Sequence, residues 1–238
     1  MSVVVAIDGP AASGKTTTAR MVAGRLDYVH LDTGAMYRAV TLACLDREVA
    51  PEVSPALREL LNGLQVRFES AGQGQRTLLN GEDVTEAIRS LEVSRQVSAY
   101  SALGEVRSRL VRLQRRIGER HDVVCEGRDI GTIVFPAARF KFYLVADLET
   151  RARRRYDELR ARGLQPSREN ILEELRARDR DDSTRALSPL LKAEDAMTVD
   201  TTDLTIAEQA DRVAGLVEAA LRRDADIRNN KEEEARHE

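Results

Sequence analysis

Mostly apolar runs of strand length recur along the chain and are separated by longer segments of mixed polarity. These runs lie at Val3–Ile7, Tyr28–Leu31, Asp122–Glu126, Phe140–Val145 and Ala196–Val199. A strand that is apolar along most of its length is buried on both faces, which is typical of a parallel sheet. We therefore predict an α/β fold in which helices cover both faces of a parallel sheet.

The segments between these runs place apolar residues at helical spacing, as Met36, Val40 and Ala43 illustrate. The predicted helices are Thr17–Leu26, Ala35–Asp46, Ala56–Leu61, most of Val84–Ile117, Leu148 to about Arg162, Pro166 into Arg178–Arg185, and Ile206–Leu221. From Arg222 onward the chain is charged and almost without apolar residues, so we expect a frayed helix or a disordered tail there.

One stretch has the alternating pattern of antiparallel strands. Leu64–Glu69 alternates with period two, Ala71–Gln75 has the composition of a turn, and Arg76–Leu79 can return antiparallel. Asn80-Gly81 then gives a second turn signal. The pattern predicts a small antiparallel insert in an otherwise alternating β/α chain.

The loop Gly9-Pro10-Ala11-Ala12-Ser13-Gly14-Lys15-Thr16 stands between the first predicted strand and the first predicted helix. It matches the phosphate-binding P-loop pattern G-x-x-x-x-G-K-[S/T] in its required context. The glycines let successive N–H groups point into one concavity, and the helix N-terminus adds its positive dipole end. Lys15 brings a cation to the outer phosphates, and the Thr16 hydroxyl can ligate Mg²⁺. We predict that Gly9–Thr17 binds a nucleoside triphosphate together with Mg²⁺.

Composition excludes several classes of partner. The chain has 238 residues, 42% of them hydrophobic and 32% charged, and a net charge of −3, which gives no bulk attraction to nucleic acid or an anionic membrane. No stretch approaches the ~18 apolar residues of a membrane helix, and the N-terminal apolar run lacks the features of a signal peptide. Cys44 and Cys125 lie among apolar neighbours, as core residues of a reducing compartment do. We expect a cytoplasmic protein without nucleic-acid or membrane partners.

Several polar segments follow predicted strands. Besides the P-loop, these are Asp32-Thr33-Gly34, Gly127-Arg128-Asp129 and the segment after Val145. Because ligands of an open parallel sheet sit at the carboxyl ends of its strands, we expect these segments to line one crevice.

Three classes of protein share a P-loop: small-molecule kinases, GTPase switches and ATP-driven motors. Asp129-Ile-Gly lacks the spacing of the GTPase D-x-x-G element, and Asn230-Lys231 stands in the polar tail with no strand before it. A motor also needs a partner-binding domain, for which 238 residues leave little room. Arginines close to the crevice suit transfer between two phosphorylated substrates, whose anionic oxygens must be neutralised. The residues therefore favour a kinase.

The motifs together resemble bacterial cytidylate kinases (CMP kinases). The resemblance runs from about Val3 to about Leu221 and is carried by Gly9–Thr16, Asp32–Arg38, Asn80–Val84, Glu126–Thr132 with Val134–Pro136, and Arg178-x₃-Asp182-Ser-x-Arg185. It implies ATP + CMP ⇌ ADP + CDP with Mg²⁺, dCMP as a second acceptor, and a monomer with core, acceptor-binding and lid regions. Thr33 and Glu126 stand where serine and aspartate are also familiar, and both keep the chemical function.

The resemblance also implies roles for particular residues. Lys15, Arg178 and Arg185 would be catalytic, with the two arginines closing over the phosphates as part of a lid. Arg38 and Arg128 would hold the acceptor phosphate, Thr33, Arg107 and Asp129 would contact the cytosine, and Ser98 and Asp182 the ribose. Arg154 and Arg155 lie where such kinases often place further phosphate-binding arginines. Guanidinium groups suit phosphate oxygens, and a carboxylate can accept from an exocyclic amino group.

Each of these residues also has a plainer interpretation. Arg178 and Arg185 could pair with Asp179, Asp181 and Asp182 in a surface network, and Arg38 could pair with an acid at the edge of the core. Tyr37 is interpreted as a core residue. The remaining arginines of the predicted helices are interpreted as solvated charges: Arg112, Arg115, Arg116, Arg160 and Arg162.

The expected organisation is a single P-loop kinase domain at residues 1–222 followed by a charged tail at 223–238. Within the domain, residues 63–95 would form the acceptor-binding insert and residues 163–188 the lid. Two alternatives to a CMP kinase stay open: a kinase for another small acceptor such as UMP, and a non-catalytic nucleotide-binding regulator.

Overall fold

The computed structural model describes residues 2–71 and 74–234. Its centre is a five-stranded sheet in the order β2-β6-β1-β7-β8. All four strand pairs are parallel, which confirms the predicted α/β class. The strands are β1 (Val4–Asp8), β2 (Val29–Asp32), β6 (Val123–Gly127), β7 (Phe140–Val145) and β8 (Met197–Asp200).

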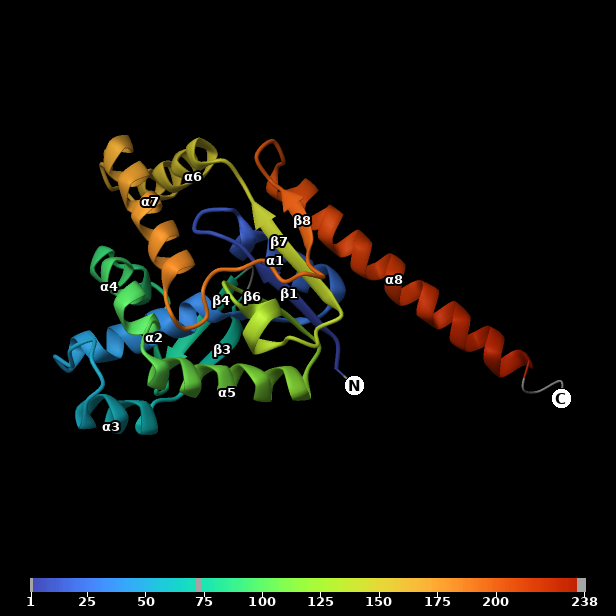
Figure 1. The fold of residues 1–238 in the computed structure, drawn as a ribbon, viewed down its shortest axis with the longest axis horizontal. Coiled ribbons are helices and arrows are strands. Elements are labelled where there is room, and N and C mark those ends of the chain that lie inside the picture. The colour runs from blue at the N-terminus through green and yellow to red at the C-terminus, as the bar shows by residue number, and fades with distance from the viewer. Residues whose placement is uncertain (1, 72–73, 235–238) are drawn as a thin grey trace.

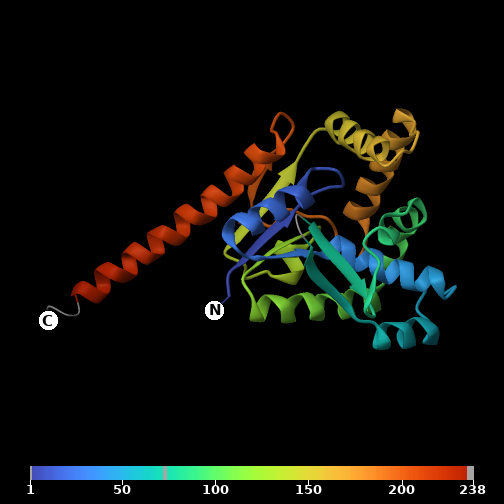
Figure 2. The same ribbon diagram turned by 180° about the vertical axis from the view of Figure 1, so that it is seen from behind.

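Helices cover both faces of this sheet (Figures 1 and 2). Successive residues of a strand point to opposite faces, so Val5 and Ile7 join one apolar layer and Ala6 the other. The first layer packs against α1 (Lys15–Leu26) and α8 (Ile206–Glu234). The second packs against α2 (Thr33–Asp46) and α5 (Gly104–Arg120). Burial on both faces is the reason that the central strands are apolar throughout.

The predicted antiparallel insert forms a separate three-stranded sheet beside the second layer. Its strands are β3 (Val66–Ala71), β4 (Gly74–Leu79) and the short β5 (Glu82–Asp83). Residues 72–73 of the predicted turn lie outside the described residues. Before the insert, Ser54 caps α3 (Pro55–Gly63) by accepting from the Leu57 N–H group.

The long helical stretch predicted after the insert is divided into three. It consists of the 3₁₀ turn η1 (Ala87–Arg89), α4 (Leu91–Ser101) and α5. Ser90 separates the first two because its hydroxyl accepts from the Val93 N–H group and starts a new helix. A second short turn, the π-helical η2 (Ile130–Val134), follows β6.

Two helices lie away from the central sheet (Figure 1). They are α6 (Leu148–Ala161) and α7 (Arg168–Thr184). Helix α7 begins two residues after its predicted start at Pro166, and Ser167 caps it. Leu159, Ile171 and Leu175 form a small third core with Ala11 of the P-loop. The segment predicted as a lid therefore packs directly on the nucleotide-binding loop.

The last helix extends well past its predicted end at Leu221 and projects from the body (Figures 1 and 2). The sequence from Leu216 to Glu234 contains no Gly or Pro, so nothing in the backbone ends the helix there. One exposed ion pair, between Arg139 and Asp224, ties its middle to the start of β7. Residues 235–238 of the predicted tail lie outside the described residues.

We expect α8 to contribute to stability through its first half. Val217 is 0% exposed, whereas Ile227 is 55% exposed. Val217→Ala should lower the free energy of unfolding by about 2–3 kcal/mol, because it removes two buried methyl groups and leaves a cavity. Ile227→Ala should change it by no more than about 0.5 kcal/mol. Urea denaturation of both variants measures this, and equal losses would show that the projecting half is packed in solution.

Candidate active site

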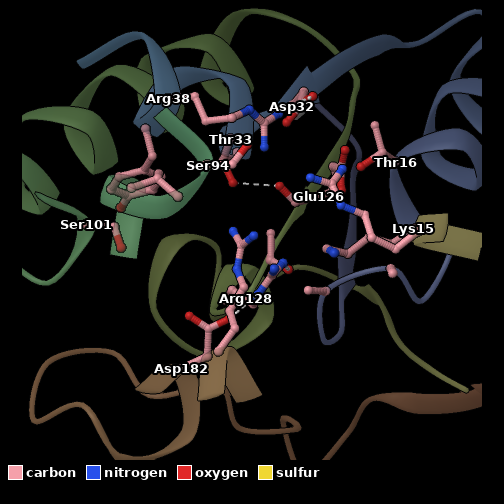
Figure 3. Close-up of a pocket in the computed structure, with 18 of the residues that line it drawn as sticks. Lys15, Thr16, Asp32, Thr33, Arg38, Ser94, Ser101, Glu126, Arg128 and Asp182 are labelled. Carbon is pink, nitrogen blue, oxygen red and sulfur yellow. Dashed lines mark hydrogen bonds and ion pairs between the residues drawn. The ribbon is translucent and has the colours of Figure 1, made fainter. Parts of the chain in front are cut away.

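One cleft of about 630 Å³ opens at the carboxyl edge of the parallel sheet. Figure 3 shows Lys15 and Thr16 facing Arg128 and Asp182 across it, with Ser94 and Ser101 on another side. The structure brings the predicted site residues together here as expected from the strand ends. Those that line the cleft are Ala11, Ala12, Gly14, Lys15, Thr16, Thr17, Thr33, Arg38, Ser98, Arg107, Arg128, Asp129, Arg178, Asp182 and Arg185.

Gly9, Pro10 and Ser13 belong to the P-loop but are not among the lining residues. Ser13 is fully buried, and its carbonyl oxygen accepts from Arg154 at 3.2 Å and from the Thr201 hydroxyl at 3.0 Å. Arg154 also donates to the Thr201 carbonyl oxygen, so its guanidinium holds backbone while it lines the cleft. The loop is thus fixed from behind, which leaves its front to a ligand. Arg155 lines the cleft as well and pairs with Glu158 at 2.9 Å.

The N-terminus of α1 has a shape that only glycine fits. Gly14 caps the helix with φ of 91°, and a Cβ there would lie 2.8 Å from the Gln209 side-chain oxygen. The same oxygen accepts from the Thr18 hydroxyl at 2.8 Å, which ties α1 to α8. Lys15 begins the helix, and its Nζ donates to the Pro10 carbonyl oxygen at 3.0 Å. The left-handed Gly14, the helix N-terminus that begins at Lys15 and the ammonium of that lysine are therefore placed as in a phosphate cradle.

Several cationic side chains of the cleft are buried, and some of their nitrogens have no hydrogen-bond partner in the described part of the chain. Burial, followed by repulsion from Arg128, lowers the pKa of Lys15 to about 7. Burial and Arg128 likewise lower the pKa of Arg178 to about 10. Arg178 Nε and Arg185 Nη2 are buried and have no hydrogen-bond partner among the described residues. A cleft in which several buried cations have lowered pKa values and such unpaired donor nitrogens favours the binding of an anion.

The acids near these cations partly compensate them. Arg128 donates to Asp182 at 2.7 Å, and Arg185 lies 3.9 Å from the other carboxylate oxygen. Burial acts to raise the pKa of Asp182, but the surrounding arginines outweigh it and keep the pKa below its usual value. Asp179, which could have joined this network, instead pairs with Arg151. Arg38 has an acid partner at the core edge, Asp32, at 3.5 Å.

A second buried pair lies deeper in the cleft. Arg107 donates to Asp129, and both side chains are almost fully buried. Arg107 also donates through Nε to the Ser188 hydroxyl at 3.0 Å and stacks 5.5 Å above the Tyr37 ring. Each group of the pair is thereby held in one orientation. Such a fixed donor and acceptor can read the edge of a planar polar ligand.

Asp8 holds the loop that carries Arg128 and Asp129. It ends β1, and its carboxylate accepts from the N–H groups of Ile130 and Gly131, each at 2.8 Å. Burial raises its pKa to about 6, although the two hydrogen bonds act in the opposite direction. The loop after β6 is thus attached to the strand from which the P-loop starts.

Comparison with known proteins identifies the family. The family model for cytidylate kinase matches residues 5–219. The chain belongs to the cytidylate kinase family. Cytidylate kinases of Exiguobacterium sibiricum and Bacillus subtilis are each 46% identical to it over 218 residues, which cover 92% of this chain and 98% and 97% of theirs. A solved structure of a putative kinase from Chloroflexus aurantiacus has a TM-score of 0.46 and 16% identity, covering 93% of this chain and 96% of that one. No helix in residues 2–71 and 74–234 is long and apolar enough to span a membrane.

Sequence reasoning missed several residues that line the cleft of this kinase. Ser94 and Ser101 flank Ser98 on one face of α4, and this helical spacing of serines is a signal that could have found them. Tyr37, interpreted as core, lines the cleft under Arg107. Arg162, interpreted as a solvated charge, lies at the rim and donates to the Arg89 carbonyl oxygen. No sequence signal distinguishes Arg162 from the other helical arginines.

We expect Asp8 to leave a distinct signature in the pH dependence of stability. The folded protein holds its proton up to about pH 6, whereas the unfolded chain releases it near 3.8. The Asp8 contribution to the free energy of unfolding is therefore largest below pH 3.8 and falls, by roughly 3 kcal/mol, as the pH rises through 6. Subtracting the unfolding profile of Asp8→Asn from that of the wild type isolates this slope. A difference that does not vary between pH 4 and 6 would contradict it.

Proposed function

We propose that this chain transfers the γ-phosphoryl group of ATP to CMP, and to dCMP, giving ADP and CDP or dCDP. The observation that carries the proposal is a cleft in which a P-loop, buried arginine nitrogens without a hydrogen-bond partner among the described residues, and the Arg107–Asp129 pair face one another. Membership of the cytidylate kinase family supports the same reaction. The roles of individual residues follow from what each can offer the two nucleotides.

On the donor side, the backbone N–H groups of Gly9–Thr17 would bind the phosphates of ATP. The loop is rigid because Arg154 and Thr201 hold its carbonyl oxygen from behind. Lys15 begins α1 beside this loop, and burial, followed by repulsion from Arg128, lowers its pKa to about 7, so an incoming anion restores its full charge. This gain is realised only when phosphate is bound.

On the acceptor side, Arg38 and Arg128 would hold the phosphate of CMP. Asp129 would accept from the exocyclic amino group of cytosine, and Arg107 would donate to its ring nitrogen or carbonyl oxygen. Thr33 would add a contact to the base, although its hydroxyl also donates to the Glu126 carbonyl oxygen at 2.7 Å. Ser98 and Asp182 would contact the ribose.

The reaction needs positioning and charge neutralisation rather than a base. A phosphate oxygen of CMP attacks the γ-phosphorus, a new P–O bond forms, and the bond to the β-phosphate oxygen breaks with its electrons leaving on ADP. Lys15, Arg178 and Arg185 would neutralise the charge that develops on the transferred group. Since α7 carries both Arg178 and Asp182 and packs on Ala11, its position affects donor and acceptor sites together.

The residues present fit a magnesium ion bound with ATP. Mg²⁺ usually keeps several waters and takes one or two protein ligands, in agreement with the absence of any three-ligand acidic or histidine cluster among the described residues. Burial acts to raise the pKa of Glu126, but His30, Lys15 and Thr16 outweigh it and keep it low, so a buried carboxylate stands beside the P-loop hydroxyl. Its Oε1 has no hydrogen-bond partner within the described chain. Thr16 and, through water, Glu126 would hold the ion, which would supply positive charge to neutralise the phosphates.

We further propose that the protein acts as a cytoplasmic monomer without nucleic-acid partners. The low net charge and the two buried, unpaired cysteines support this setting. The division into a kinase domain at 1–222, an acceptor insert at about 63–95 and a lid at about 163–188 belongs to the same proposal. The packing of α6 and α7 in a core of their own supports the lid as a unit.

Removing the P-loop cation should abolish most of the rate. We expect Lys15→Ala to lower kcat at least about a hundredfold, or ~2.7 kcal/mol of barrier, because the developing phosphoryl charge loses its mobile cation. Lys192→Ala, which removes an exposed lysine, is the matched control. Both are measured by coupled ADP formation with CMP, after circular dichroism confirms folding. Normal turnover of Lys15→Ala would remove this loop from the mechanism.

Acceptor choice should follow hydrogen-bond direction in the Arg107–Asp129 pair. Uracil offers an oxygen where cytosine offers an amino group, and an N–H where cytosine offers a bare nitrogen. Two mismatched buried pairs cost about 1–3 kcal/mol each, or roughly 10²–10⁴ in kcat/KM. We expect CMP and dCMP to be good acceptors and UMP poor, with Asp129→Asn narrowing the ratio.

The measurement is kcat/KM for CMP, dCMP, UMP, AMP and GMP with wild type and Asp129→Asn. Equal use of UMP and CMP by the wild type would show that this pair does not read the base. ADP formation with another acceptor alone would identify a different kinase, and nucleotide binding without turnover would identify a regulator.

A further inference from the structure

His30 is a buried residue whose side chain has no obvious structural role. It lies on β2, its side chain is 9% exposed, and neither ring nitrogen has a hydrogen-bond partner among the described residues. Its backbone carbonyl oxygen accepts from the Gln75 side-chain amide of the insert at 2.8 Å, which fixes this point of the edge strand. A buried imidazole with two unpaired nitrogens costs stability relative to an apolar ring.

The nearest charged group to this ring is Glu126. The register of β2 and β6 pairs His30 with Val124, so Glu126 lies two residues further along on the same face of the sheet. His30 Nε2 is 3.7 Å from Glu126 Oε1, and that carboxylate is 3% exposed. The separation is slightly longer than a hydrogen bond, and such contacts tighten readily when a ligand fills a site. Both atoms lack another partner within the described chain.

Glu126 in turn faces the phosphate-binding loop. Figure 3 shows Glu126 in the cleft, near Thr16 and Asp32. Lys15, Thr16 and Glu126 all line this cleft. Burial acts to raise the pKa of Glu126, and Lys15 and Thr16 are among the groups that act against it. A carboxylate that must act through water on an ion needs a fixed orientation, and a neighbouring ring N–H is a common way to provide it.

We propose that His30 is a positioning residue that orients the Glu126 carboxylate toward the magnesium ion of the bound nucleotide by donating from Nε2 to Oε1. This inference rests on the proposed function, because it assigns a partner to the acid that would hold the metal waters. It explains why a polar ring is kept at a position where the sheet offers it no structural partner. It also places a contact of the acceptor insert, through Gln75, directly beside the donor site.

The test measures the thermal stability of the protein and its metal-dependent affinity for nucleotide. The proposal predicts that only the affinity falls. In His30→Phe the ring is retained without its donor, so the midpoint of thermal unfolding should stay unchanged or rise. Affinity for Mg·ADP, measured by calorimetry, should fall about 10- to 100-fold, whereas affinity for ADP in EDTA and for CMP should not change. His121→Phe, at an exposed histidine, is the control and should match the wild type throughout.

His30→Gln supplies a second, polar variant in case Phe does not fold at this position. Its amide can still donate to Glu126, so Mg·ADP affinity should stay within about threefold of the wild type. Equal loss of ADP affinity with and without Mg²⁺, or wild-type Mg·ADP affinity in His30→Phe, would overturn the proposal. Failure of the wild type itself to form ADP from CMP would instead count against the proposed function.

Discussion

The cleft depends on one electrostatic constraint: several cations are buried close together and the protein alone does not neutralise them. Burial, followed by repulsion from a nearby arginine, lowers the pKa of Lys15, Arg178 and Arg185. Burial also acts to lower the pKa of Arg128, but the Asp182 carboxylate outweighs it and that pKa is raised. Such a cluster is costly in isolation and becomes favourable when phosphate oxygens enter it. The buried cations are therefore not fully neutralised until phosphate groups bind.

Several other residues hold in place the loops that carry these cations. The P-loop is fastened from behind by Arg154 and Thr201, and the loop after β6 by the carboxylate of Asp8. Arg151 joins the P-loop to α7, since it donates to the Ala11 carbonyl oxygen and to both oxygens of Asp179. A displacement of α7 would therefore affect the P-loop through a few buried contacts.

The acids of the cleft are few and each is placed for a particular partner. Asp182 pairs with Arg128 and lies near Arg185, so in the proposed function the ribose and phosphate of CMP would share these arginines with a residue of α7. Asp129 takes Arg107, which presets the donor and acceptor pair before any base is present. Glu126 Oε1 and both ring nitrogens of His30 have no hydrogen-bond partner within the described chain. In the proposed function, this distribution of acids would separate the two nucleotides within one continuous cleft.

Local sequence determined the parallel sheet, the P-loop and the positions of most strands and helices. Those features follow from apolar runs, from helical spacing and from a loop whose glycines and lysine act on their own neighbours. It also placed the polar segments at strand ends, because the carboxyl ends of parallel strands share one edge. What it could not decide were partners far apart in the chain. The pairing of Asp179 with Arg151 rather than with the lid arginines, the attachment of Asp8 to the loop at 130–131, and the burial of His30 against Glu126 all depend on which strands and helices become neighbours. The predicted end of the last helix at Leu221 rested on local composition, because the segment that follows is almost without apolar residues. The helix continues to Glu234, since that segment contains no Gly or Pro to end it.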